Sequence, residues 1–214
     1  MLRRDVVWIV GGGWSLEHFD WLKLRSCRVV AVNRAIEVVP WAEILYFSDF
    51  RFWGWYKEKL KNFSGRICTM AKYPKGEWAE VGVEKWKSTG ITGLDFTPRH
   101  LRNGNNSGYA ALNVVAQLEG VRTMVLLGFD MCVSPTSHPR TDGVHWHSGY
   151  PIPTRSRALD NMLPNWSSLV GPLAKRGLTV INASEVSKIT CFPKMSVEDA
   201  LHQFSTEEVA DACH

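Results

Sequence analysis

Apolar runs of strand length recur along this chain, and each one ends at glycine or at short polar residues. The first, Val6–Val10, is apolar at every position and is followed at once by Gly11-Gly12-Gly13. A strand without polar alternation is covered on both faces, as strands of parallel sheets are. The run therefore favours a fold in which a sheet lies between two layers of helices.

Strand-like and helical segments alternate in the rest of the chain. Further strands are predicted in Cys27–Ala35, Trp41–Phe50, Gly65–Tyr73, Arg122–Met131 and Gly177–Ser184. Helical patterns occupy Ser15–Leu24, Ser107–Gly120 and Asn161–Arg176, the last with Pro172 as a candidate break. This alternation predicts an α/β fold, a Rossmann-like and mostly parallel sheet with helices on both faces.

The length of 214 residues fits one domain with a small appendage. We assign residues 1–195 to the Rossmann-like domain, with 75–106 and 132–158 as loop or lid segments. Residues 196–214 are expected to form an acidic helical tail, either solvated or in contact with a partner.

Composition excludes several classes of protein. With 45% hydrophobic and 21% charged residues the chain has an ordinary globular composition, and a net charge of +4 permits anionic ligands without requiring them. The five cysteines are widely spaced and form no CxxC pair, which is typical of a reduced, cytoplasmic protein without a zinc knuckle. No apolar stretch has the length of a membrane span, and the N-terminal run lacks a signal-peptide cleavage site.

Polar residues follow several of the predicted strands directly. They are Gly11–Gly13, Asn33, Ser48-Asp49 and Asp130. Ligands of parallel α/β sheets bind at the carboxyl ends of the strands, so these residues are expected to meet in one crevice.

The glycine turn is a candidate phosphate site. It precedes a predicted helix with Ser15 as N-cap, and a backbone without Cβ atoms can approach an anion closely. The turn matches neither GxGxxG, because Leu16 stands at the third glycine position, nor a P-loop. A plain turn is the alternative interpretation.

A second helix start lies at Asn106-Ser107-Gly108. Its amides could hold another part of the same anion, although capping alone explains Asn106 or Ser107.

Two histidines, His145 and His147, flank Trp146 in a loop rich in glycine and proline. A metal site would need a third ligand from His138, Asp142 or Asp130, and the spacing matches no known metal motif, so no metal is predicted. A general base is favoured, because the ordinary pKa of imidazole lies near neutrality. A loop histidine without a role is the alternative.

The order of these motifs resembles that of the bacterial sialyltransferases. The strings are GGGWSL, VVAVNRA, LYFSDF, NSGYAALNVVAQL and VLLGFDM, followed by a loop histidine, and the resemblance covers roughly residues 6 to 190. The pattern is also similar to the wider superfamily, which includes the archaeal-type 6-hydroxymethylpterin diphosphokinases and many bacteriophage proteins of unassigned chemistry. The phage proteins, with HWH after GFDM, look most alike.

The resemblance implies a nucleotide or nucleotide-sugar site in residues 1–195. Trp14 stands where the family pattern has proline, and Ser107 and Gly108 would hold the ribose or phosphate region. With the strand ends and both helix starts, the predicted contact residues are Gly11, Gly12, Gly13, Trp14, Ser15, Asn33, Ser48, Asp49, Asn106, Ser107 and Gly108.

The resemblance also implies catalytic roles. Asp130 would close the crevice, and His145 or His147 would deprotonate an acceptor hydroxyl. The sialyltransferases place a tyrosine soon after G-x-D, where this chain has Met131-Cys132. Tyr150 or Arg155 would then serve as the anion clamp.

The expected activity is that of a metal-independent glycosyltransferase. It would transfer a sugar from a nucleotide-activated donor such as a CMP-sugar. This donor is a co-substrate, and no cofactor is expected to be required. The acceptor would be a glycan, a small molecule or modified DNA. One alternative is an ATP-dependent diphosphokinase-like enzyme with Mg²⁺ held by Asp49 and Asp130. Another is a nucleotide-binding phage protein that sequesters its ligand without turnover.

The DNA acceptor is motivated by the segment Phe50–Phe63, in which aromatic and basic residues alternate. An amphipathic helix that covers the sheet is the favoured interpretation of the same segment. The expected location is the cytoplasm, that of the host if a phage encodes the chain, and the oligomeric state is left open.

Overall fold

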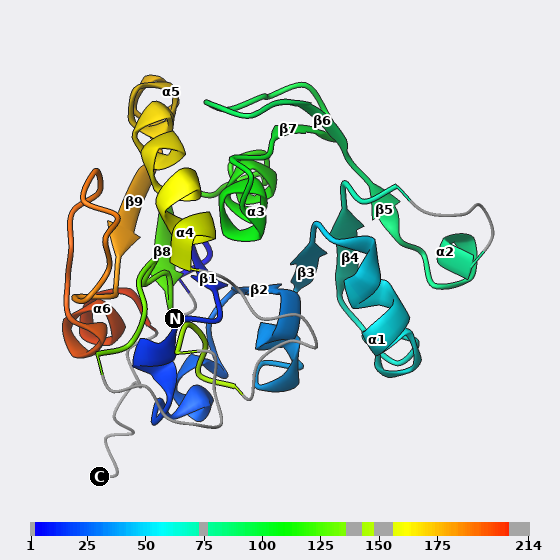
Figure 1. Cartoon of the computed structure of the whole chain (residues 1–214), viewed down its shortest axis with the longest axis horizontal. Helices are drawn as coiled ribbons and strands as arrows, with labels where there is room; N and C mark the ends of the chain where they lie inside the picture. Colours follow the sequence, from blue (N-terminus) through cyan, green and yellow to red (C-terminus); the bar gives the residue numbers. More distant parts are fainter. Residues whose placement is uncertain (1–2, 73–76, 136–142, 148–155, 206–214) are drawn as a thin grey trace, which may run out of the picture.

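The chain folds around a parallel sheet, and the predicted α/β class is confirmed. The computed structural model describes residues 3–72, 77–135, 143–147 and 156–205. The main sheet has seven strands in the order β5-β4-β3-β2-β1-β8-β9, all paired in parallel (Figure 1). These strands are β1 (Val6–Val10), β2 (Val29–Val32), β3 (Ile44–Phe47), β4 (Arg66–Thr69), β5 (Glu84–Lys85), β8 (Thr123–Leu127) and β9 (Thr179–Asn182).

Helices and short 3₁₀ turns connect the strands. The helices are α1 (Phe50–Leu60), α2 (Glu77–Glu80), α3 (Ser107–Val115), α4 (Ser156–Met162), α5 (Val170–Lys175) and α6 (Val197–Phe204). The 3₁₀ turns are η1 (Trp14–Leu16), η2 (Trp21–Leu24), η3 (Asn33–Glu37) and η4 (Leu163–Leu169). A separate parallel pair consists of β6 (Lys87–Gly90) and β7 (His100–Arg102).

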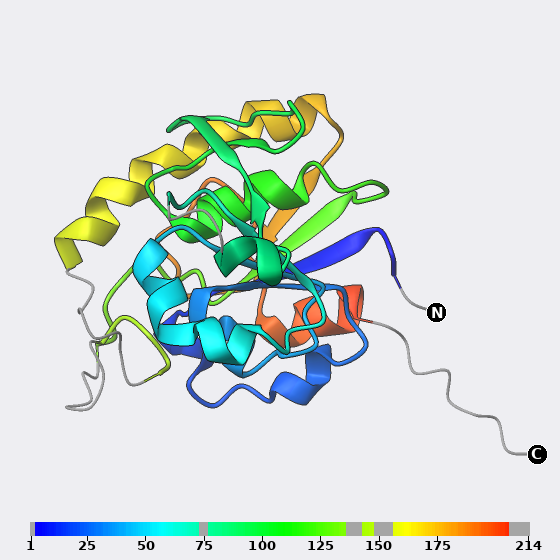
Figure 2. The ribbon, with the colours of Figure 1, turned by 90° about the vertical axis from the view of Figure 1, so that its right-hand side faces the viewer.

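The strands bury both faces, as their unbroken apolar runs predict. Alternate side chains of β1 point to opposite sides: Val7 and Ile9 join a core beneath α3, η4 and α5, whereas Val6, Trp8 and Val10 join a core with α1, the N-terminal 3₁₀ turns and α6. Figure 2 shows the two helical layers above and below the sheet. A buried side chain of this size adds about 1.5–3 kcal/mol to stability.

The segment Ser15–Leu24 is not the predicted helix. It forms two 3₁₀ turns, η1 and η2, and Asp20 caps η2 by accepting a hydrogen bond from the Leu22 amide at 3.1 Å. Leu22, expected on the buried face of a helix, is 70% exposed. The connection from β1 therefore lacks a regular helix with aligned peptide dipoles.

The segment 75–106 is more structured than the loop or lid predicted for it. Its described part contains α2, β5, β6 and β7, and β5 extends the main sheet at its edge beside β4. Residues 73–76 lie outside the described part.

The C-terminal half of the chain differs from expectation at two places. Segment Asn161–Arg176 is divided into the end of α4, η4 and α5, and Pro172 lies inside α5 without ending it. The tail helix α6 is not a solvated appendage, because Ala200 and Phe204 are buried in the core of the lower layer.

The strand order places a topological switch point beside β1. From β1 the chain proceeds through β2, β3, β4 and β5 toward one edge of the sheet, and β8 and β9 later fill the other side. Connections from β1 and β8 therefore diverge and leave a crevice at their carboxyl ends, which is where ligands of such sheets bind.

Candidate functional site

A cavity of about 600 Å³ lies in this crevice. Its walls come from the ends of β1, β2, β3 and β8, the start of α3, the first turns of α1, the histidine segment and α4. The lining residues are Gly11, Gly12, Gly13, Val32, Asn33, Asp49, Arg51, Phe52, Trp55, Asn105, Asn106, Ser107, Gly108, Gly128, Phe129, Asp130, Met131, Val144, His145, Ala158, Leu159 and Met162. The size is that of a typical small-molecule site.

Most of the predicted contact residues therefore meet in one place. Trp14, Ser15, Ser48 and His147 lie outside the described lining of this cavity. Ser48 instead lines an adjoining cavity of about 680 Å³, which shares Asp49 and 105–107 with the first.

The glycine turn is held by hydrogen bonds within the protein. The amides of Gly11 and Gly13 donate to the carbonyls of Leu127 and Gly128, both at 2.8 Å, and the Trp14 amide donates to the Val144 carbonyl at 3.1 Å. Because these amides are occupied and η1 is only a single 3₁₀ turn, the turn differs from an open phosphate-binding loop.

Asp130 anchors the turn from β8. Its carboxylate is 1% exposed and accepts hydrogen bonds from the Ser15 amide (2.8 Å), the Ser15 hydroxyl (2.7 Å) and the Ser184 hydroxyl (2.6 Å). A Cβ atom on Gly13 would lie 2.5 Å from Asp130 Oδ2, so the close approach requires glycine. These contacts fit a structural role for Asp130 beneath the cavity.

The histidine segment pairs with the glycine turn as a short antiparallel strand. Gly13 and His145 form an isolated β-bridge, and the Trp146 amide donates to the Gly12 carbonyl at 3.1 Å. A Cβ atom on Gly12 would lie 2.9 Å from His145 Cδ2, so this glycine lets the imidazole cover the turn. This bridge thus brings together the two motifs that the sequence singled out.

The two histidines occupy different environments. His145 is half-buried and lines the cavity, whereas His147 is 6% exposed and lies behind it. Their rings are stacked, with centroids 4.8 Å apart and planes inclined by 13°. His145 is therefore the histidine placed to reach a ligand.

Left-handed backbone is concentrated around the cavity. Asn33 (φ 54°), Asn105 (φ 54°) and Met131 (φ 50°) are non-glycine residues with positive φ, and all three line the cavity. This conformation costs about 1–2 kcal/mol for most residues and clusters at functional sites. For Met131, which has no polar side chain to offset the cost, the surrounding fold must impose it.

The start of α3 is capped by its own residue. Asn106 Oδ1 accepts hydrogen bonds from the amides of Gly108 (2.8 Å) and Tyr109 (3.1 Å). A Cβ atom on Gly108 would lie 2.0 Å from Phe129, so this glycine serves close packing. An anion at this helix start would meet Ser107 rather than a full set of free amides.

Asp49 performs a similar task for α1. It accepts a hydrogen bond from the Arg51 amide at 2.9 Å and forms an ion pair with the Arg51 guanidinium. Hydrogen bonds from that guanidinium hold the pKa of Asp49 below its ordinary value of 3.8. The Ser48 hydroxyl donates to the Tyr46 hydroxyl at 3.3 Å.

Arg51 and Trp55 are site residues that the sequence analysis did not place in the crevice. They lie four residues apart on one face of α1, and Trp55 is 39% exposed. The signal available in the sequence was the string that follows the third strand, Ser48-Asp49-Phe50-Arg51. The same helix buries Phe52, Trp53, Tyr56 and Leu60, so the segment 50–63 contains the sheet-covering amphipathic helix that was favoured over a DNA-binding one.

Other predicted residues lie outside the described part of the chain. These are Tyr150 and Arg155, proposed as an anion clamp, and His138 and Asp142, considered as metal ligands. Among the described residues, no group of three or more histidine, cysteine, aspartate or glutamate side chains is arranged to hold a metal ion. No described helix is both long and apolar enough to cross a membrane.

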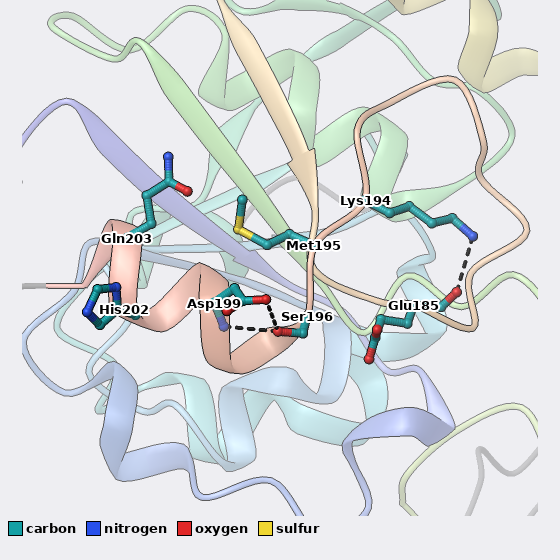
Figure 3. A pocket seen from close by; sticks show the side chains of 7 residues that line it. All are labelled: Glu185, Lys194, Met195, Ser196, Asp199, His202 and Gln203. Carbon is teal, nitrogen blue, oxygen red and sulfur yellow. Dashed lines mark hydrogen bonds between the residues drawn. The ribbon is translucent and has the colours of Figure 1, made fainter.

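A further hollow of about 950 Å³ lies between α6 and the loop after β9. Figure 3 shows that three of its polar side chains are engaged locally: the Ser196 hydroxyl contacts Asp199, and Lys194 donates to the Glu185 carbonyl. None of the sequence motifs contributes to it, and the strained residues lie elsewhere. The cavity at the switch point is therefore the candidate site.

Comparisons of the chain with protein-family models, with curated proteins and with solved structures found no match.

Proposed function

We propose that the chain is a transferase that binds a nucleotide-activated sugar in the switch-point cavity and uses His145 as its general base. The observation that carries the proposal is the position of His145, a side chain with a ring nitrogen that can accept a proton, against a cavity that also contains Arg51, Trp55 and Ser107. These groups match the parts of such a donor: a planar base, an anionic phosphate and a sugar.

Each group has a distinct task in this proposal. The indole of Trp55 offers a flat surface on which a nucleobase can stack. Arg51 is the one cation among the described lining residues, and with the Ser107 hydroxyl it would bind the phosphate. Asn33 and Asn105, both on left-handed backbone in the cavity lining, would donate hydrogen bonds from their side-chain amides to the sugar hydroxyls. The adjoining cavity offers room for the remainder of a larger substrate.

The transfer step balances without another reactant. The oxygen of the acceptor hydroxyl forms a bond to the anomeric carbon, and its proton passes to a ring nitrogen of His145. The bond from the anomeric carbon to the phosphate oxygen breaks, and its electron pair leaves with the nucleotide. Arg51 would stabilise the charge that develops on the departing phosphate.

The engagement of both carboxylates favours this metal-free proposal over a Mg²⁺-dependent diphosphokinase. Asp130 accepts three hydrogen bonds from Ser15 and Ser184, and Asp49 is paired with Arg51. Either residue would have to give up these contacts to coordinate a cation. The acceptor, whether a glycan, a small molecule or DNA, and a cytoplasmic location are parts of the same proposal.

A binding panel tests the donor first. Thermal unfolding would be followed with CMP, UMP, AMP and GMP, their sugar conjugates and triphosphates, with and without Mg²⁺. A ligand specific to the folded state raises the melting temperature by mass action. A metal-independent rise with a nucleotide monophosphate and its sugar conjugate supports the proposal, whereas a rise with ATP and Mg²⁺ alone favours the diphosphokinase.

The base is tested by release of free nucleotide from the sugar donor that binds. His145→Gln should lower turnover by about 10²–10⁴-fold with binding retained. The matched control is His18→Gln, which removes an exposed histidine two residues after η1. Tight binding without turnover in the wild type would instead support a sequestering protein.

A further inference from the structure

His147 lies in the second layer of the site, between His145 and Arg34. Its ring is stacked on that of His145, and its Nδ1 atom lies 3.1 Å from Nη1 of Arg34. Arg34 directly follows the cavity residue Asn33 at the start of η3. A row of three side chains therefore extends from the cavity wall into the protein.

The Arg34 contact determines where the proton of His147 resides. A guanidinium has N–H donors and no acceptor, so Arg34 must donate and His147 Nδ1 must accept. The proton of the neutral ring is then on Nε2. A proton on Nδ1 would place two donors face to face and break the contact.

Arg34 is itself fixed by Glu37. Nε and Nη2 of Arg34 donate to Oε2 of Glu37 at 3.2 and 2.9 Å, and Lys59 of α1 donates to Oε1 at 3.3 Å. Burial acts to raise the pKa of Glu37, but hydrogen bonds from Arg34 and Tyr56 outweigh it and hold the pKa below its ordinary value of 4.5. The carboxylate thus stays ionised and keeps the guanidinium oriented.

We propose that His147 is a positioning residue, held by Arg34 as the Nε2–H tautomer, and that it orients His145 as the one base of the pair. The neutral imidazole of His147 lies nearly parallel to the His145 ring, with the centroids 4.8 Å apart. Its π-face would therefore be against the His145 ring when His145 takes up a proton. The base role of His145 rests on the proposed function, whereas the tautomer of His147 does not.

The tautomer is measured by ¹⁵N NMR of the full chain labelled at histidine. In the wild type, the long-range ¹H–¹⁵N correlations of His147 should show an unprotonated Nδ1 and a protonated Nε2. Arg34→Met removes the donor and should allow the Nδ1–H form to appear. An Nδ1–H tautomer in the wild type, or an unchanged spectrum in Arg34→Met, would overturn the proposal.

Arg28→Met is the matched control. Arg28 forms the same kind of two-pronged pair, with Nε and Nη2 donating to Glu43 at 3.1 and 3.0 Å, but it lies at the other end of β2. This variant should leave both histidine signals unchanged. If Arg28→Met shifts them as much as Arg34→Met does, the effect is a general loss of structure, and the assignment of a specific contact is wrong.

Turnover separates this inference from the proposed function. With the sugar donor that binds, Arg34→Met should lower kcat by up to about 10²-fold and leave KM for the donor nearly unchanged, because only the orientation of the base is lost. His147→Asn, which keeps an acceptor near the Nδ1 position, should retain the Arg34 contact but lose the ring stack. If the tautomer is as expected and no donor binds the wild type, the proposed function fails alone.

Discussion

Asp130 holds Ser15 through both carboxylate oxygens, with the Ser15 amide at 2.8 Å from Oδ2 and its hydroxyl at 2.7 Å from Oδ1. One buried side chain just after β8 thus fixes the turn just after β1. The two strands that border the switch point are therefore connected beyond their carboxyl ends as well as by their pairing within the sheet.

Replacing Asp130 should destabilise the protein. In Asp130→Asn the amide group presents a donor where hydroxyl donors now point, which should lower the free energy of unfolding by about 1.5–3 kcal/mol. Urea denaturation followed by circular dichroism measures this. Asp160→Asn, which changes an exposed aspartate of α4, should have little effect. Equal stability of both variants and the wild type would mean that the carboxylate contributes nothing to the turn.

Two glycine substitutions should have opposite effects. Gly13→Ala would place Cβ 2.5–2.7 Å from the Asp130 carboxylate and should lower the melting temperature. Gly54→Ala adds a Cβ with no atom within 4 Å inside α1, and should stabilise the helix by about 0.5–1 kcal/mol. Thermal unfolding of the two variants tests the pair, and a stable Gly13→Ala protein would contradict the packing of the turn.

The charge of Asp49 should make stability depend on pH. Its pKa is lowered in the folded state by hydrogen bonds from Arg51, so its contribution is fully present above the ordinary value of 3.8 and is lost as pH falls through the lowered value. Asp49→Asn should therefore reduce the acid-induced loss of stability without changing its direction. Urea midpoints measured at pH values above and below 3.8 give the comparison, and parallel curves for both proteins would contradict it.

Asn33 allows backbone and side-chain roles to be separated. Asn33→Gly suits φ 54° and should keep or slightly raise stability, whereas Asn33→Ala should lose roughly 1 kcal/mol. If the amide contacts the sugar, both variants should bind the donor more weakly by a similar factor. Calorimetric titration beside thermal unfolding distinguishes the two roles, and unweakened binding in Asn33→Gly would remove the side chain from the site.

The sheet and the position of the crevice were predictable because both follow from local patterns. Buried runs such as Val6–Val10 and Thr123–Leu127 specify strands by themselves, and parallel strands necessarily bring their carboxyl ends together. Strand β5 was not predictable, since Glu84–Lys85 has no apolar pattern and is a strand through its pairing with β4.

The details of the site depend on contacts between distant parts of the chain. Three glycines after a strand fit a phosphate loop as well as a packed turn, and the choice between them depends on acceptors such as the carbonyls of Gly128 and Val144. The apolar spacing of Leu16, Phe19 and Leu22 suits a helix, yet Asp20 starts a new turn instead. Nothing local to His147 indicates its contact with Arg34.

The β-bridge between Gly13 and His145 implies that the imidazole of His145 is placed by main-chain atoms. Its location is set by the amides and carbonyls of Gly12, Trp14, Val144 and Trp146, none of which depends on side-chain chemistry. Mutations that weaken the docking of this segment would therefore move His145 away from the cavity while its side chain remained unchanged. Conversely, a different side chain introduced at position 145 would occupy the same location in the cavity lining, which makes this position a natural place to install new chemistry.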